Sequence, residues 1–210
     1  MSRRLALAAL AIATVGLSGC ISLFPKAEPS QLYRFEASVA PPKAPASGPV
    51  YGVLRVASGF PRASSGDRIL TINERGEAAY IAGARWISPA AVLFDESVSA
   101  AFQNATRVRL VSRGEVTKAE FAAKLDVTRF EVVYDNGPKA APKIVVIVRA
   151  LVSRTQDRAL VGDKTFTAEV RASENRVGAI VPAFNQALTQ VLTEMVAWTN
   201  AADEKSNLPG

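Results

Sequence analysis

The one cysteine of this 210-residue chain, Cys20, is the side chain best placed for covalent chemistry. It follows two small residues, Ser18 and Gly19, and an apolar stretch from Leu5 to Leu17 that Thr14 alone interrupts. Thirteen helical residues span about 20 Å, well short of the ~30 Å hydrocarbon core of a bilayer. Together with two preceding arginines, the segment is more typical of an export signal than of a transmembrane anchor.

The tetrapeptide Leu17-Ser18-Gly19-Cys20 resembles the bacterial lipobox. This resemblance implies that the Cys20 thiol receives a diacylglycerol, that the signal peptide is cut before it, and that the new amine is acylated. Three acyl chains would make the attachment effectively permanent. The next residue is Ile21, where an inner-membrane retention signal has Asp, so the resemblance implies the periplasmic face of the outer membrane. The other interpretations are an ordinary signal peptide or a short buried helix.

Composition excludes most catalytic chemistry. The chain has no histidine, which removes the Ser-His-Asp triad, the Cys-His dyad and the HExxH zinc helix. The loop from Gly59 to Gly66 has the spacing of a phosphate-binding loop, but Asp67-Arg68 replaces the required Lys-Ser/Thr. Acidic pairs occur, but nothing in the sequence places two of them in one cleft. We therefore expect no enzymatic activity, no metal site and no cofactor.

Charge gives little support for nucleic-acid binding. The formal net charge of +6 falls to +4 once cleavage removes Arg3 and Arg4. The remaining basic residues are scattered along the chain, which indicates a solvated surface. Attraction to anionic lipid headgroups is the second interpretation.

One segment, from Tyr80 to Pro89, is unusual for a surface. Tyr80 and Trp86 bracket small residues and Arg85, just before a predicted helix start. Trp, Tyr and Arg dominate interface hot spots, so Tyr80, Arg85 and Trp86 are candidate residues for docking a partner. The structural alternative is that Tyr80 and Trp86 belong to the core and that Arg85 stacks or pairs nearby.

Periodicity predicts the elements that position this segment. Alternation and β-branched runs indicate strands at 32–35, 51–56, 69–73, 78–81, 108–111, 124–134, 143–153 and 160–170. Ser88 as N-cap and Pro89 as first helical residue predict a helix that ends near Asn104. An apolar stripe predicts a second helix over 177–199, with Pro182 in its first turns. The stripe consists of Ile180, Phe184, Ala187, Leu188, Val191, Met195 and Trp198.

Two of the strand predictions carry detail. Gly76 suits a positive φ in the turn between 69–73 and 78–81, which we expect to form a hairpin. Strict alternation over 124–134 places Asp126, Thr128, Phe130, Val132 and Tyr134 on one face and Leu125, Val127, Arg129, Glu131 and Val133 on the other. Neither face is purely apolar, so the register of this strand is uncertain.

These elements predict an α+β fold, an antiparallel β-sheet with two main helices packed on one face. The expected organisation is a signal peptide over 1–19, a lipidated tether over 20–31, one domain over 32–200 and a polar tail over 201–210.

The order of several motifs resembles the ABC-type transport auxiliary lipoprotein family (PqiC-like). After the lipobox and tether come Tyr33-Arg34-Phe35, a Pro-rich gap, a Val-Leu-Arg-Val strand and Gly66-Asp67-Arg68-Ile69. The segment from Tyr80 to Trp86 and a last helix with Phe184-Asn185-Gln186-Ala187 complete the pattern, which covers roughly Leu32 to Thr199.

This resemblance implies a non-catalytic subunit, anchored in the outer membrane and facing the periplasm. Its partners would be a protein with a mammalian-cell-entry domain and an ABC transporter permease/ATPase complex, which move lipids between the two membranes. Two alternatives stay open: a lipid-binding module with an acyl chain in a groove between sheet and helices, and a structural envelope lipoprotein. A lipid groove requires roughly 300 Å³ or more of apolar space.

Overall fold

The described residues form an α+β fold of eight strands and two helices, in the order that periodicity predicts. A computed structural model describes residues 29–41, 50–56, 58–103, 107–111 and 118–201. Its elements are β1 Gln31–Tyr33, β2 Tyr51–Arg55, β3 Arg68–Asn73, β4 Ala78–Trp86, α2 Ala90–Gln103, β5 Val108–Val111, β6 Phe121–Tyr134, β7 Lys143–Arg154, β8 Leu160–Arg171 and α3 Val177–Asn200.

The sheet divides along its longest strand, β6. On one side, β6, β7 and β8 form an antiparallel meander over almost their full lengths. On the other side, the first part of β6 pairs in parallel with β2 and its last part pairs in parallel with β3. The hairpin partner β4 extends the sheet beyond β3, and β1 and β5 are short parallel edge strands. Strands that follow each other in a hairpin are therefore antiparallel, whereas the pairings of β6 with β2 and β3 are parallel.

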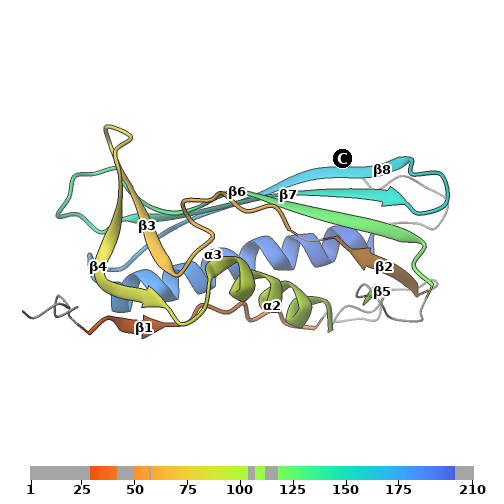
Figure 1. The fold of residues 1–210 in the computed structure, drawn as a ribbon, viewed down its shortest axis with the longest axis horizontal. Coiled ribbons are helices and arrows are strands. Elements are labelled where there is room, and N and C mark those ends of the chain that lie inside the picture. Colours follow the sequence, from red (N-terminus) through yellow and green to blue (C-terminus); the bar gives the residue numbers. More distant parts are fainter. Residues whose placement is uncertain (1–28, 42–49, 57, 104–106, 112–117, 202–210) are drawn as a thin grey trace, which may run out of the picture.

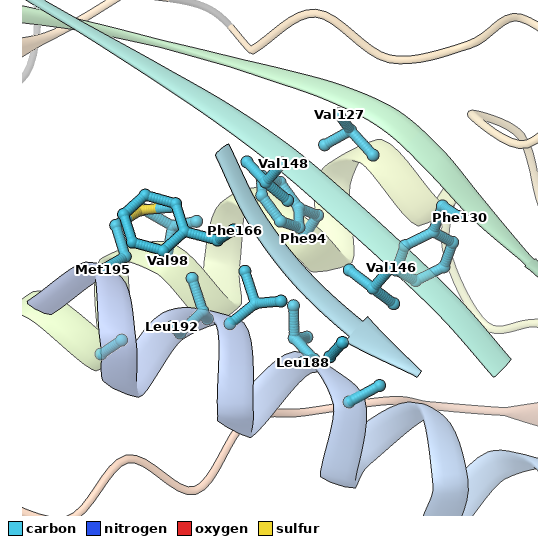
Figure 2. Close-up of a cluster of buried hydrophobic side chains, with 14 of the residues drawn as sticks. Phe94, Val98, Val127, Phe130, Val146, Val148, Phe166, Leu188, Leu192 and Met195 are labelled. Carbon is cyan, nitrogen blue, oxygen red and sulfur yellow. The ribbon is translucent and has the colours of Figure 1, made fainter. Parts of the chain in front are cut away.

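Both helices cover the same face of the sheet, as predicted (Figure 1). All seven residues of the predicted α3 stripe are buried. They meet apolar side chains from β6, β7, β8 and α2 in one continuous core, part of which Figure 2 shows. Such burial is the main source of stability for an amphipathic helix, since each large side chain contributes about 1.5–3 kcal/mol when fully buried.

Strand β6 contains a bulge that the sequence pattern does not reveal. Its pairing with β7 shifts register between Val127 and Arg129. The buried side chains are Leu125 and Val127 before the shift, and Phe130 and Val132 after it. The prediction of two faces with strict alternation through residues 124–134 is therefore wrong. One extra residue changes which side of the pleat faces the core.

Helix α2 begins at Ala90, one residue later than predicted. The Pro89 carbonyl accepts the first helical hydrogen bond, at 3.1 Å, so Pro89 and not Ser88 occupies the N-cap position. The amides of Ala90 and Ala91 donate to the carbonyls of Gly66 and Ser65, in the loop before β3, at 2.9 and 3.2 Å. The β3–β4 hairpin forms as expected, with φ of +77° at Gly76.

An extended segment after β1, which we call the strap (residues 34–39), lies across both helices. Its Phe35 and Val39 side chains enter the core, with 1% and 9% of their surface exposed. The strap is held to α2 by one ion pair and to α3 by two hydrogen bonds: Arg34 to Glu96 (2.6 Å), Glu36 N–H to Asn185 Oδ1 (3.1 Å) and Ser38 N–H to Thr189 Oγ1 (3.0 Å).

Cys20, the predicted signal peptide, most of the predicted tether and most of the predicted polar tail lie outside the described residues. Within those residues, neither helix is long and apolar enough to cross a membrane.

Candidate functional site

Trp86, one of the three candidate docking residues, is part of the aromatic core. Only 2% of its surface is exposed. Its ring meets Phe35 and Phe184 edge-to-face, with centroids 4.9 and 5.2 Å apart. Phe130 contacts both of these phenylalanines, at 5.0 and 4.9 Å. Trp86 therefore connects the strap to α3 and β6 and does not present its ring to a partner in this conformation.

Tyr80 lies at the surface of the β3–β4 hairpin, where Arg68 stacks on it. The guanidinium carbon of Arg68 is 3.8 Å from the ring centroid. The Tyr80 hydroxyl donates to the Ala63 carbonyl at 3.0 Å, which fixes the ring against the preceding loop. A cation over an aromatic face stabilises such a pair by about 0.5–1 kcal/mol when it is exposed.

Arg85 pairs with Asp67 on the same surface. The Arg85 Nη1 to Asp67 Oδ2 distance is 2.9 Å, and the two side chains are 44% and 47% exposed. The Trp86 amide donates to the Asp67 carbonyl at 2.7 Å, which fixes this acid beside β4. An ion pair this exposed adds little stability, so it is available for exchange with a charged group on a partner.

The structure brings Tyr80 and Arg85 together through Arg68 and separates Trp86 from them. Arg68 lies opposite Arg85 in the β3–β4 pairing and also stacks on Tyr80. Since side chains alternate along a strand, Trp86 points to the core while its neighbour Arg85 points outward. The surface formed by Arg68, Tyr80 and Arg85 is hereafter the arginine–tyrosine surface.

The sequence analysis did not identify Arg68 as a site residue. The one feature of the sequence that pointed to Arg68 was its place in the Gly66-Asp67-Arg68-Ile69 motif. The contact with Tyr80 depends on the hairpin register, which periodicity does not define to the residue. The docking role of Tyr80 and Arg85 stays a prediction.

A small apolar cavity lies between the sheet and the ends of both helices. Its wall is formed by side chains of β2, β5, β6, β7, β8, α2 and α3, among them Val53, Phe121, Met195 and Trp198. Its volume is about 40 Å³. Pockets that hold small ligands measure roughly 300–1,000 Å³, so an acyl chain does not fit without movement of the core.

Two polar residues at the wall of this cavity, Tyr51 and Thr199, contact each other. The Tyr51 hydroxyl donates to the Thr199 carbonyl, and the Arg107 guanidinium carbon lies 5.8 Å from the Tyr51 ring centroid. Burial raises the pKa of Tyr51, while the charge of Arg107 opposes that shift. The Tyr51 hydroxyl therefore stays protonated at neutral pH and serves as a structural hydrogen-bond donor.

Ionisable groups on the opposite face of the sheet form exposed ion pairs. Arg171 forms a two-pronged pair with Asp135, at 2.5 and 2.8 Å, and lowers the pKa of that carboxyl to about 2. Arg149 pairs in the same way with Asp163, across β7 and β8. In the part of the chain that the structure describes, no cluster of three or more His, Cys, Asp or Glu side chains is arranged to hold a metal ion.

Comparison with known proteins gives one family and several related structures. Residues 33–196 match the family described as "ABC-type transport auxiliary lipoprotein component". A crystal structure of a protein from Xanthomonas campestris, placed in the family DUF330, has a TM-score of 0.71 at 29% identity and covers 81% of this chain and 95% of its own. No curated protein matches the chain.

Two further solved structures share the fold at low identity. An uncharacterised protein has a TM-score of 0.62 at 13% identity, covering 81% of this chain and 98% of its own. A hypothetical protein from Chlamydia trachomatis has a TM-score of 0.50 at 14% identity, covering 72% of this chain and 96% of its own.

Proposed function

The chain belongs to the family of ABC-type transport auxiliary lipoprotein components, and on that premise we propose that it docks to a lipid-transporting assembly in the bacterial envelope. The proposed partners are a protein with a mammalian-cell-entry domain and an ABC permease/ATPase complex. ATP hydrolysis takes place on those subunits, and this chain contributes binding. The family match carries the proposal, because it extends over residues 33–196 and so includes both helices and nearly the whole sheet.

The proposed anchor is a lipidated Cys20 in the outer membrane, with the domain in the periplasm. Support comes from the apolar segment, from Ser18 and Gly19 before the cysteine, and from Ile21 after it. The family's description as a lipoprotein component agrees with this arrangement.

The proposed docking site is the arginine–tyrosine surface. Arg68 and Arg85 are exposed, and Tyr80 is half-buried with its ring orientation already fixed. Arg and Tyr are enriched among interface hot spots, and a side chain that is already ordered loses less entropy on binding. The small volume of the apolar cavity favours docking over the carriage of a lipid inside this domain.

Affinity purification tests the proposal. The full-length lipoprotein is captured from detergent-solubilised membranes, and the co-eluting proteins are identified by mass spectrometry. We expect a protein with a mammalian-cell-entry domain or an ABC permease among them. The variant Tyr80→Ala/Arg85→Glu should lose these partners. The variant Arg149→Glu is the matched control, because its side chain is 48% exposed and also pairs with an aspartate, but on β7.

Two results would contradict the proposal. A preparation of the wild-type protein without partners would leave the lipid-binding and structural alternatives, and lipid analysis of the same sample would distinguish them. Equal loss of partners in Tyr80→Ala/Arg85→Glu and Arg149→Glu would argue against the arginine–tyrosine surface as the docking site.

A further inference from the structure

One outward face beside the first strand combines exposed aliphatic and arginine side chains. β1 pairs in parallel with the second part of β4, with Leu32 opposite Arg85. A hydrogen bond from the Ile87 amide to the Tyr33 carbonyl, at 2.7 Å, continues this pairing past the end of β4. Because side chains alternate along paired strands, Leu32, Arg85 and Ile87 share the face that points away from Trp86.

The two aliphatic side chains on this face are strongly exposed. Leu32 is 61% and Ile87 is 56% exposed, whereas most large aliphatic side chains of the described residues are buried. Arg68 lies beside Arg85 in the next strand, and one acid, Asp67, pairs with Arg85. Leu32, Ile87, Arg68 and Arg85, hereafter the β1-side patch, therefore combine apolar groups with a net positive charge.

The length of chain between Cys20 and β1 limits how far this patch can lie from the membrane. Ten residues lie between Cys20 and Gln31, where β1 begins, so the fully extended chain reaches at most about 40 Å from the anchored cysteine. A tether this short gives the patch a high effective concentration at the membrane surface. A contact too weak to bind a free domain is then sufficient to orient a tethered one.

We propose that the β1-side patch contacts the phospholipid surface that holds the lipid anchor. This inference rests on the anchoring proposed above. Leu32 and Ile87 enter the boundary between headgroups and acyl chains, and the two arginines meet lipid phosphates, as on other interfacial protein surfaces. Anionic phospholipid is the preferred partner because Arg68 and Arg85 outnumber Asp67.

The contact orients the domain. β1 and the start of β8 lie at opposite ends of the long axis (Figure 1). With β1 on the membrane, the turn between β7 and β8 points away from it. Arg68 and Arg85 belong both to the β1-side patch and to the arginine–tyrosine surface. On the membrane they face lipid, and a partner contacts the remaining part of that surface, at Tyr80, from the side of the β3–β4 hairpin.

Site-directed fluorescence on the full-length acylated protein tests this contact. Leu32→Cys, Ile87→Cys and Leu160→Cys each add one reactive thiol, since Cys20 is occupied by its thioether. Leu160 is the matched control, because it is 59% exposed but lies at the start of β8. Each variant is labelled with a polarity-sensitive dye and reconstituted, without partner proteins, into vesicles of phosphatidylethanolamine and phosphatidylglycerol.

Labels at positions 32 and 87 should emit at shorter wavelength and be quenched by brominated lipid, while a label at 160 should do neither. Emission at 32 and 87 equal to that at 160 would overturn the contact. A shift that appears only after addition of solubilised partner complex would also overturn it and make the patch a protein interface. Flotation of all three variants with the vesicles measures the anchor separately, and its loss would overturn the anchor together with this inference.

Discussion

At the scale of single residues, two neighbours in β4 have opposite roles. Trp86 is 2% exposed and Arg85 is 44% exposed, although one peptide bond joins them. Residue type alone suggested one docking cluster of Tyr80, Arg85 and Trp86. The pleat of the strand places Arg85 and Trp86 on opposite sides. The β3–β4 pairing shifts register between the Arg85 and Tyr80 pairs, so alternation along the strand does not relate Tyr80 to Trp86. Residue types therefore single out the segment, but only the strand pairing shows which of its side chains are exposed.

Replacement of Trp86 should reduce stability far more than it affects docking directly. Trp86→Ala removes a buried ring that contacts Phe35 and Phe184, and we expect a loss of about 3–5 kcal/mol in the free energy of unfolding. Trp86→Phe keeps part of the packing and should cost less. Urea unfolding followed by circular dichroism measures both. A loss below 1 kcal/mol for Trp86→Ala would mean that this ring does not hold the core.

The Asp135–Arg171 pair should make stability depend on acid pH. The hydrogen bond from Arg171 lowers the pKa of Asp135 to about 2, below the ~3.9 of an unfolded chain. The folded state thus binds fewer protons, so the stabilisation is present above pH 4 and is lost as the pH falls through about 2. The pair is partly exposed, which keeps its contribution small and sensitive to salt.

The measurement is the thermal unfolding midpoint of wild type and Asp135→Asn between pH 6 and pH 1.5. Other paired carboxylates also titrate in this range, so the difference between the two proteins isolates Asp135. We expect this difference to shrink as the pH falls. A difference that stays constant with pH would show that the carboxylate charge of Asp135 does not stabilise the fold.

At the scale of elements, the patterns that repeat without interruption were predictable. The α3 stripe keeps helical spacing over its whole length, and every predicted member is buried. In β6, buried apolar residues stand at odd-numbered positions before the bulge between Val127 and Arg129 and at even-numbered positions after it, because the bulge changes the buried face. A strict period of two cannot describe such a strand, so the sequence defined its position but not its register.

The strap is an element that the sequence did not predict, since its residues fall at the end of the predicted strand 32–35 and at the start of the Pro-rich gap. Asn185→Ala/Thr189→Ala removes the two side-chain acceptors that bind the amides of Glu36 and Ser38. We expect faster hydrogen exchange at these two amides with a small change in global stability, about 1 kcal/mol per lost hydrogen bond. Site-resolved hydrogen exchange measures this change.

Gln186→Ala/Gln190→Ala is the control for the strap variant, because both side chains lie on the exposed side of α3. Equal exchange rates at Glu36 and Ser38 in the two double variants would show that the α3 acceptors do not fix the strap. In that case the burial of Phe35 and Val39 and the Arg34–Glu96 pair would hold it.

At the scale of the whole molecule, the fold class was predictable and the full topology was not. Hairpins join neighbours in sequence, so an antiparallel sheet of consecutive strands predicts the pairs β3–β4, β6–β7 and β7–β8. The parallel pairings of β6 with β2 and β3 connect segments far apart in the chain, and no local sequence pattern specifies them. The parallel pairing of β1 with β4 is likewise between segments far apart in the chain, and it places Arg85 next to Leu32.

The lipid anchor makes a prediction for the whole protein. The buried core of the described residues lies between Phe35 and Trp198, so we expect loss of lipidation to leave the unfolding midpoint unchanged. Cys20→Ala removes the only thiol, but its apolar signal segment could stay uncleaved. A second variant therefore replaces residues 1–20 with a signal peptide that is cleaved without lipidation.

Membrane fractionation followed by a high-salt wash should find the wild type in the membrane and the exchanged variant in the soluble fraction. If only the β1-side patch holds the exchanged variant at the membrane, the high-salt wash should release it. Salt screens the attraction between the arginines and the anionic headgroups. Retention of the exchanged variant after the wash would mean that contacts of the folded domain, and not acyl chains on Cys20, hold this protein at the membrane.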